Sequence, residues 1–246
     1  AAMAVVLLSA AYTATAGLGP VSVFYNNERM IPIYCVDTQE KKIAISFDAA
    51  WGADKTEELL RILKEHNVKT TFFLVAFWVE KFPDMVKKID EEGHEIGNHS
   101  ANHPNMSQLG EEKIRQELTT TSDKIEAITG KKTTLFRPPF GDYNNRVMRI
   151  SKELGYHVIQ WDVDSLDYKD YGANSIIERV ISKVKNGSIV LFHNNATYIT
   201  DALPVILDKL HEMGYEIVPI SQLIYKENYY VDHTGKQIKL KEGVNQ

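Results

Sequence analysis

Short apolar runs alternate with helical patterns along most of the chain. Runs rich in β-branched and aromatic residues predict strands at residues 43–47, 70–75, 95–97, 134–136, 157–160, 188–191 and 216–218. Apolar positions at helical spacing predict helices at residues 55–66, 83–92, 111–129, 144–154, 174–185, 201–213 and 220–225. This alternation is typical of a largely parallel sheet covered by helices. We therefore expect an α/β fold, a single distorted (β/α) barrel of about seven parallel strands.

The two ends of the chain have their own patterns. Residues 21–25 and 31–36 predict a short N-terminal β-hairpin, and residues 229–240 predict a second hairpin that turns near Thr234-Gly235. We expect four parts: residues 1–20 as a signal or anchor remnant, 21–42 as a hairpin and connector, 43–226 as the barrel domain and 227–246 as a C-terminal extension.

The first 27 residues carry no charge, and the apolar run at residues 3–11 is followed by Ala14-Thr15-Ala16. This pattern is typical of the end of a signal peptide that is cleaved after a small residue. An Ala-rich helix packed on the domain and an uncleaved membrane anchor are alternatives, although Ser9, Tyr12 and Thr13 interrupt the apolar run. We expect an extracytoplasmic protein, either secreted or associated with the cell envelope or the spore.

The overall charge narrows the choice of partners. The net charge is -5 and no Lys/Arg run occurs, so the sequence has no electrostatic footprint for nucleic acid. Cys35 is the single cysteine, which excludes an internal disulfide and a Cys-based metal site. We expect a monomer that binds a polysaccharide and not a nucleic acid.

Polar motifs follow several of the predicted strands. His99 and His103 are four positions apart, and on a helical turn both imidazoles point the same way and bind one divalent cation. Such a pair alone is more often a surface or core feature, but this pair opens a loop after a strand, between Gly97-Asn98 and Pro104.

Asp48 ends an apolar strand, where a carboxylate serves as a ligand or general base, or as a turn or N-cap residue. Arg137 begins the motif RPPFGD, which offers a fixed cation and backbone N–H groups for an oxyanion, or forms a structural corner. Two further motifs, WDVDSLDY from Trp161 and LFHN from Leu191, place polar groups beyond apolar strands. All of these motifs occur where a barrel carries its chemistry.

In order and spacing these five motifs resemble the polysaccharide deacetylase family, carbohydrate esterase family 4, whose members share a NodB homology domain. The resemblance runs from about residue 43 to residue 225 and is greatest to the sporulation-associated deacetylases of spore-forming Gram-positive bacteria. It implies that residues 43–226 form a NodB-like deacetylase domain, a hydrolase acting on amide bonds.

The resemblance also implies a role for each matching residue. These roles are general base for Asp48, metal ligands for His99 and His103, restraint of the base for Arg137, oxyanion N–H for Phe140, general acid for His193, tuning of the acid for Asp164, and lining of the acetyl pocket for Leu191 and Trp161.

The sequence departs from the family at Ala49, where members usually carry a second Asp that completes the metal site. Asp54 and Asp48 are candidate substitutes, but Asp54 is better explained as a helix N-cap that forms a capping box with Glu57. We expect one weakly bound divalent metal, Zn or else Co, Ni or Mn.

The predicted function is metal-dependent removal of N-acetyl groups from amino sugars of peptidoglycan. Deacetylation of chitin oligosaccharides or acetyl-xylan is an alternative. Because of Ala49, a catalytically weak glycan-binding protein of the envelope or spore is another.

Overall fold

The computed structural model describes residues 29–240 of the chain. The strands are β1 (Cys35–Val36), β2 (Lys42–Ala49), β3 (Thr71–Leu74), β4 (Glu95–Asn98), β5 (Leu135–Phe136), β6 (His157–Val158), β7 (Val163–Asp164), β8 (Ile189–His193), β9 (Glu216–Ile217), β10 (Tyr229–Val231) and β11 (Lys236–Lys239). The α-helices are α2 (Thr56–Glu65), α3 (Ala76–Lys81), α4 (Pro83–Glu91), α5 (Glu111–Thr129), α6 (Asn145–Glu153), α7 (Ala173–Lys183), α8 (Ile199–Glu212) and α9 (Ile220–Leu223). Short 3₁₀ turns are η1 (Met106–Gln108), η2 (Pro139–Gly141) and η3 (Asp167–Lys169).

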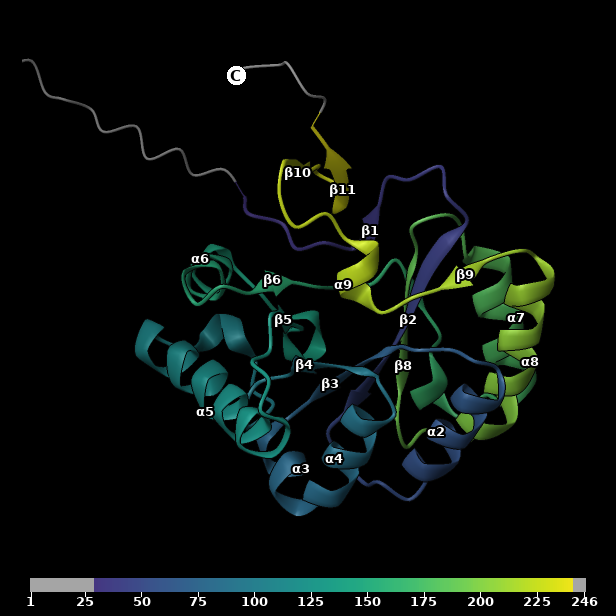
Figure 1. Cartoon of the computed structure of the whole chain (residues 1–246). Helices are drawn as coiled ribbons and strands as arrows, with labels where there is room; N and C mark the ends of the chain where they lie inside the picture. The colour runs from purple at the N-terminus through teal and green to yellow at the C-terminus, as the bar shows by residue number, and fades with distance from the viewer. Residues whose placement is uncertain (1–28, 241–246) are drawn as a thin grey trace, which may run out of the picture.

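The main sheet is parallel and has the strand order β6-β5-β4-β3-β2-β8-β7, with β9 also paired to β2. The N-terminal segment lies across the opening of this curled sheet, because Ile33 bridges Ile159 after β6 and Cys35 bridges Ser188 before β8. The predicted α/β class and distorted barrel are confirmed. Figure 1 shows the helices packed around the outside of the strands.

Strand β2 divides two hydrophobic layers. Ile43, Ile45, Phe47 and Ala49 face the helices and belong to one apolar cluster, whereas Ala44 lies in a second cluster inside the curled sheet. Successive side chains of a strand point to opposite faces, so Ser46 and Asp48 share the inner face with Ala44. The strand therefore delivers Asp48 inward and Ala49 outward.

A small second sheet has the order β1-β11-β10 and lies at one end of the molecule beside α9 (Figure 1). The predicted C-terminal hairpin is present, since β10 and β11 pair antiparallel. The first strand of the predicted N-terminal hairpin lies outside the described residues, as does the predicted signal segment. The second strand contributes Cys35–Val36, which pair with β11 in parallel.

The capping box predicted at Asp54 is absent. Helix α2 begins at Thr56, and its N-cap is Lys55 without a side-chain capping bond.

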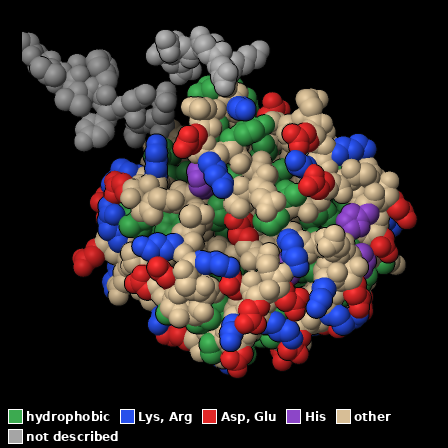
Figure 2. All heavy atoms as spheres, viewed as in Figure 1, with side chains coloured by type: hydrophobic (Ala, Val, Ile, Leu, Met, Phe, Trp, Pro, Cys, Tyr) green, Lys and Arg blue, Asp and Glu red, His purple; other side chains and the backbone are tan. Residues whose placement is uncertain are grey.

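Within residues 29–240, no helix combines the length and apolarity required to cross a bilayer. On the face in Figure 2, acidic and basic side chains are interspersed over the surface.

Candidate active site

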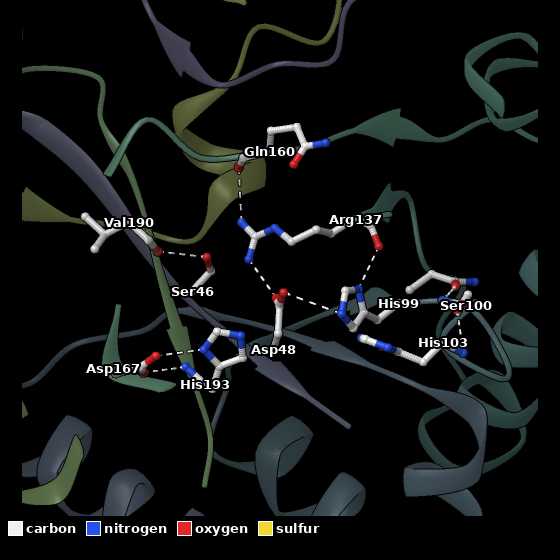
Figure 3. A network of polar contacts seen from close by, with 11 residues as sticks. Ser46, Asp48, His99, Ser100, His103, Arg137, Gln160, Asp167, Val190 and His193 are labelled. Carbon is white, nitrogen blue, oxygen red and sulfur yellow. Dashed lines mark hydrogen bonds and ion pairs between the residues drawn. The ribbon is translucent and has the colours of Figure 1, made fainter. Parts of the chain in front are cut away.

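Asp48 lies at the C-terminal end of β2, where it is 7% exposed. The buried Arg137 donates from Nη1 to Asp48 Oδ1 at 2.8 Å and from Nη2 to the Gln160 carbonyl at 3.2 Å (Figure 3). The same guanidinium lies 4.2 Å from the ring centre of Phe73. Burial acts to raise the pKa of Asp48, but the charge and hydrogen bond of Arg137, together with the nearby His99 and His193, outweigh it, so the pKa lies below its usual value. Asp48 is therefore an oriented carboxylate at neutral pH.

His99 and His103 lie in a loop after β4 and not on the predicted helical turn. Ser100 and His103 have positive φ angles of 68° and 56°, and this bend brings the two imidazole centres to 5.0 Å. His99 donates from Nδ1 to the carbonyl of Arg137 at 2.7 Å, so its unprotonated Nε2 faces Asp48 Oδ2 at 3.5 Å. Burial lowers the pKa of His99, and lowers that of His103 to about 4. Both rings are neutral at pH 7 and can serve as ligands.

The loop between the two histidines is held by a carboxylate that the sequence analysis missed. Glu117 on α5 accepts from the backbone N–H groups of Ala101 and Asn102, each at 2.8 Å, and from the Asn102 side chain at 2.7 Å. In sequence, Glu117 is one of many charged residues on a long helix, and its charge suggests a solvated face. Its burial becomes visible only when α5 packs beside this loop.

His193 ends β8 and lies opposite Asp48, its register partner on the neighbouring strand. The carboxylate that contacts the His193 ring is Asp167, which the sequence analysis did not name, whereas the predicted Asp164 acts on the ring through its charge. Asp167 accepts from His193 Nδ1 and from the His193 backbone N–H, both at 2.7 Å, whereas Asp164 Oδ1 accepts from the Leu166 N–H. The two-residue strand β7 ends at Asp164, and the left-handed turn at Leu166 then brings Asp167 under the ring.

Opposing influences set the charge of His193. Burial would lower its pKa, but the hydrogen bond and charge of Asp167, with the charges of Asp48 and Asp164, raise it above the usual value. The ring is therefore biased toward the protonated form, while the facing Asp48 is biased toward the ionised form. Such divergent environments are typical of an acid and base pair.

These groups surround one cavity of about 650 Å³. The predicted site residues that line it are Asp48, His99, His103, Phe140, Trp161, Asp164, Leu191 and His193. Arg137 lies behind Asp48, where Trp161 also contacts it at 5.6 Å from the ring centre. Phe140 has a φ angle of 59° and is 66% exposed at the cavity edge. Trp51, Tyr168 and the Asn194–Asn195 pair also line the cavity without having been predicted as site residues.

The donor set partly fits a divalent cation. His99 Nε2 carries no proton, and the buried Nδ1 of His103 has no hydrogen-bond partner among the described residues. Two imidazoles are thus available, but residues 29–240 contain no cluster of three His, Cys, Asp or Glu arranged for a metal. Ala49 is fully buried among apolar side chains. The residues present fit a metal held by two histidines and solvent.

Comparisons with known proteins agree with this architecture. Residues 36–159 match the family model for polysaccharide deacetylase. A peptidoglycan-N-acetylglucosamine deacetylase of Bacillus cereus is 36% identical over 194 residues, which cover 77% of this chain and 91% of that protein. The uncharacterized protein YlxY of Bacillus subtilis is 35% identical over 193 residues, or 78% of this chain. The match spans 60% of the length of YlxY.

Among solved structures, BA3943 of Bacillus anthracis, described as a CE4 family pseudoenzyme, has a TM-score of 0.76 and 37% identity, covering 78% of this chain and 68% of that one. A mutant of BA3943 is described as having restored enzymatic activity. The predicted family is confirmed: this chain belongs to the polysaccharide deacetylase family, whose named relatives include peptidoglycan deacetylases.

Proposed function

We propose that this chain hydrolyses N-acetyl groups of amino sugars in peptidoglycan, outside the cytoplasm, with a divalent metal. The observation that carries the proposal is the pairing of Asp48 and His193 across adjacent strands, with pKa values shifted in opposite senses from those of a free carboxyl and imidazole. Hydrolysis of an amide needs a base for water and an acid for the departing amine, and these two groups match that need.

The residues divide the work as follows. Asp48, oriented by Arg137, accepts the proton of the attacking water. The His193 ring, oriented by Asp167, donates a proton to the amine that leaves. His99 and His103 would hold the metal, which supplies polarisation of the acetyl carbonyl when bound. Leu191 and Trp161 border the cavity where the acetyl group would lie, and the Phe140 N–H would face its oxygen.

Two features of the comparisons support peptidoglycan as the substrate class. The Bacillus cereus relative is named for N-acetylglucosamine, and a Bacillus subtilis relative, 34% identical over 188 residues, is named for N-acetylmuramic acid. A cell-wall polymer implies a location outside the cytoplasm. The spore is included in this proposal because of the resemblance described above.

A second function, glycan binding with weak or no catalysis, is favoured by one observation. Ala49 lies on the outward face of β2, in the apolar core, and supplies no ligand. The similar BA3943 is described as a pseudoenzyme.

One assay separates the two functions. Purified protein is freed of metal, reloaded with Zn, Co, Ni or Mn, and incubated with N-acetylglucosamine oligomers, muropeptides and acetyl-xylan, and acetate is quantified. Metal-dependent acetate release from the N-acetylglucosamine oligomers or the muropeptides supports the first function. Absence of acetate with every metal and substrate rejects it.

A further inference from the structure

Gln160 follows β6 and carries a buried side-chain amide, since the residue is 1% exposed. The described residues that line the cavity include its neighbour Trp161 but not Gln160 itself, and the proposed chemistry gives it no role. A buried amide costs free energy unless its polar atoms are hydrogen-bonded. The partners of Gln160 therefore indicate what the residue does.

Two groups of Gln160 hold the loop that carries the RPPFGD motif. The side-chain Nε2 donates to the carbonyl of Gly141 at 3.0 Å. The backbone carbonyl accepts from Nη2 of Arg137 at 3.2 Å, while Nη1 of the same guanidinium donates to Asp48 (Figure 3). Gln160 thus contacts both the residue that begins this loop and the residue four positions later.

Phe140 lies between these two points and has an unusual backbone conformation. The φ angles of Phe140 and Gly141 are 59° and 66°. The left-handed region is unfavourable for a residue with a side chain, so surrounding contacts must hold Phe140 there. Beyond the turn, the Asp142 carboxylate accepts from the N–H and the hydroxyl of Ser107, each at 2.8 Å. Gln160 and Ser107 therefore hold the turn together.

The Gln160 side chain also packs closely against the turn. A Cβ atom added to Gly141 would lie 3.2 Å from Oε1 of Gln160 and 3.3 Å from Cη2 of Trp161. Both distances are shorter than an ordinary van der Waals contact. The turn therefore has little room to shift toward Gln160 while the amide is in place.

The N-terminal segment fixes the backbone of Gln160. The Gln160 N–H donates to the carbonyl of Ile33 at 2.7 Å, and the Ile33 N–H donates to the carbonyl of Val158 at 2.9 Å. Ile33 bridges Ile159 in parallel, so residues 158–160 are paired like a strand. The side-chain amide therefore projects from a backbone that is already held in place.

We propose that Gln160 is a positioning residue that holds the turn at Phe140, so that the Phe140 N–H keeps a fixed place relative to Asp48. This inference rests on the proposed function, in which that N–H faces the acetyl oxygen. A hydrogen-bond donor speeds the reaction only where charge develops in the transition state, and a displaced donor loses this effect. Gln160 itself touches no reacting atom.

The test removes the amide while keeping the size of the side chain. Gln160→Met has no donor for the Gly141 carbonyl, and the matched control is Gln237→Met. Gln237 is also buried and also holds a backbone segment, because it donates to the Tyr225 carbonyl at 2.6 Å and accepts from the Tyr225 N–H at 2.9 Å. It belongs to β11 in the small second sheet. The control therefore removes an equally buried amide from the other sheet.

The first measurement follows the Phe140 backbone without turnover. The full chain, labelled with ¹⁵N-phenylalanine and kept in EDTA, is studied by NMR, and Phe140→Leu assigns the signal. The amide and α protons of one residue lie closest at a φ of about +60°, so the wild type should show a strong cross-peak between them. We expect Gln160→Met to weaken this cross-peak and Gln237→Met to leave it unchanged.

A wild type without the strong cross-peak, or an unchanged cross-peak in Gln160→Met, overturns the proposal. If Gln160→Met does not fold, Gln160→Glu takes its place, because an ionised carboxylate has no proton to donate to the Gly141 carbonyl.

The second measurement is acetate release from the N-acetylglucosamine pentamer. We expect Gln160→Met to lower kcat roughly 10- to 100-fold and to change KM less than about threefold, because the contact with the oxyanion forms only in the transition state. Gln237→Met should leave both values unchanged. An unchanged kcat in Gln160→Met, or an equal loss of kcat in the two variants, overturns the proposal.

Failure of the proposed function gives a different result. If the wild type releases no acetate with any metal, but Gln160→Met alone loses the Phe140 cross-peak, the hold on the turn stands and the enzyme is rejected. If the wild type releases acetate and Gln160→Met changes neither the cross-peak nor kcat, the enzyme stands and this inference is rejected.

Discussion

Asp167 accepts hydrogen bonds from both the ring Nδ1 and the backbone N–H of His193. One buried carboxylate thus fixes the orientation of the imidazole and raises its pKa, against the opposing effect of burial. Because Nδ1 donates to Asp167, the ring presents Nε2 for proton transfer.

Asp167→Asn should therefore lower the pKa of His193 and move the alkaline limb of the pH–rate profile for acetate release to lower pH. In the proposed mechanism the protonated His193 ring is the acid, so activity should be lost as the pH rises through the pKa of that ring. The rate at neutral pH should fall roughly 10²-fold or more. Asp164→Asn is the matched control and should shift the limb less. A larger shift in Asp164→Asn than in Asp167→Asn would make Asp164 the main residue that tunes His193.

The Arg137–Asp48 pair should dominate the electrostatic contribution to stability in the site. Arg137→Met leaves a buried carboxylate without its partner, and we expect a loss of about 3–5 kcal/mol in the free energy of unfolding at pH 7. Urea denaturation measures it. Exposed ion pairs are weak, so Arg115→Met, which breaks the surface pair with Glu153, should lose much less.

The pH dependence of that loss has a defined sign. The folded-state pKa of Asp48 lies below the unfolded value, so its stabilisation is present above the unfolded pKa and is lost as pH falls through the folded one. The difference in the free energy of unfolding between wild type and Arg137→Met should therefore become smaller as the pH falls. A gap that widens as pH falls would show that the carboxylate is not stabilised by Arg137.

Ala49→Asp tests whether position 49 supplies a missing ligand. The residue lies on the outward row of β2, so in EDTA the new carboxylate is buried without a partner and should lower stability by about 1–3 kcal/mol. If it reaches the two histidines, divalent metal should bind more tightly and recover the melting temperature. If metal affinity is unchanged and the variant stays destabilised after metal is added, position 49 belongs to the apolar core and supplies no ligand.

Glu117 should act through the loop that it holds. Glu117→Ala removes a carboxylate that accepts from two backbone N–H groups, so it should lower the free energy of unfolding by about 2–3 kcal/mol. It should also weaken the binding of cobalt, which is measured by the visible absorption of the bound ion. Glu117→Gln keeps one carbonyl acceptor, so it should lose less stability and less cobalt affinity than Glu117→Ala. Cobalt affinity equal to wild type in Glu117→Ala would show that the loop keeps its shape without this residue.

Much of the fold could be predicted from the sequence, because long segments with a regular spacing of apolar residues indicate helices and strands clearly. The structure places α5 at Glu111–Thr129, with an αL cap at Gly130, as the pattern predicts. Strand β7 was missed because two residues show no alternation, and α3 was missed because AFWVEK follows a strand without a capping residue.

The site was predicted less completely than the fold. Its residues were found from their position after strands, but their partners depend on loop conformations that sequence does not display. The positive φ angles at Ser100 and His103 replace the expected helical turn, and the one at Leu166 brings Asp167 into hydrogen-bond contact with His193 in addition to the charge of Asp164. Such turns are set by tertiary contacts, and Glu117 contributes the clearest of them.

The central claim is that Asp48 and His193 hydrolyse an N-acetyl group. It is tested most directly by acetate release from the N-acetylglucosamine pentamer, comparing wild type with Asp48→Asn and His193→Ala under the same metal. We predict acetate from the wild type and a loss of at least about 10²-fold in each variant, with pentamer binding retained. Absence of acetate from the wild type, or equal rates in all three proteins, would contradict the account.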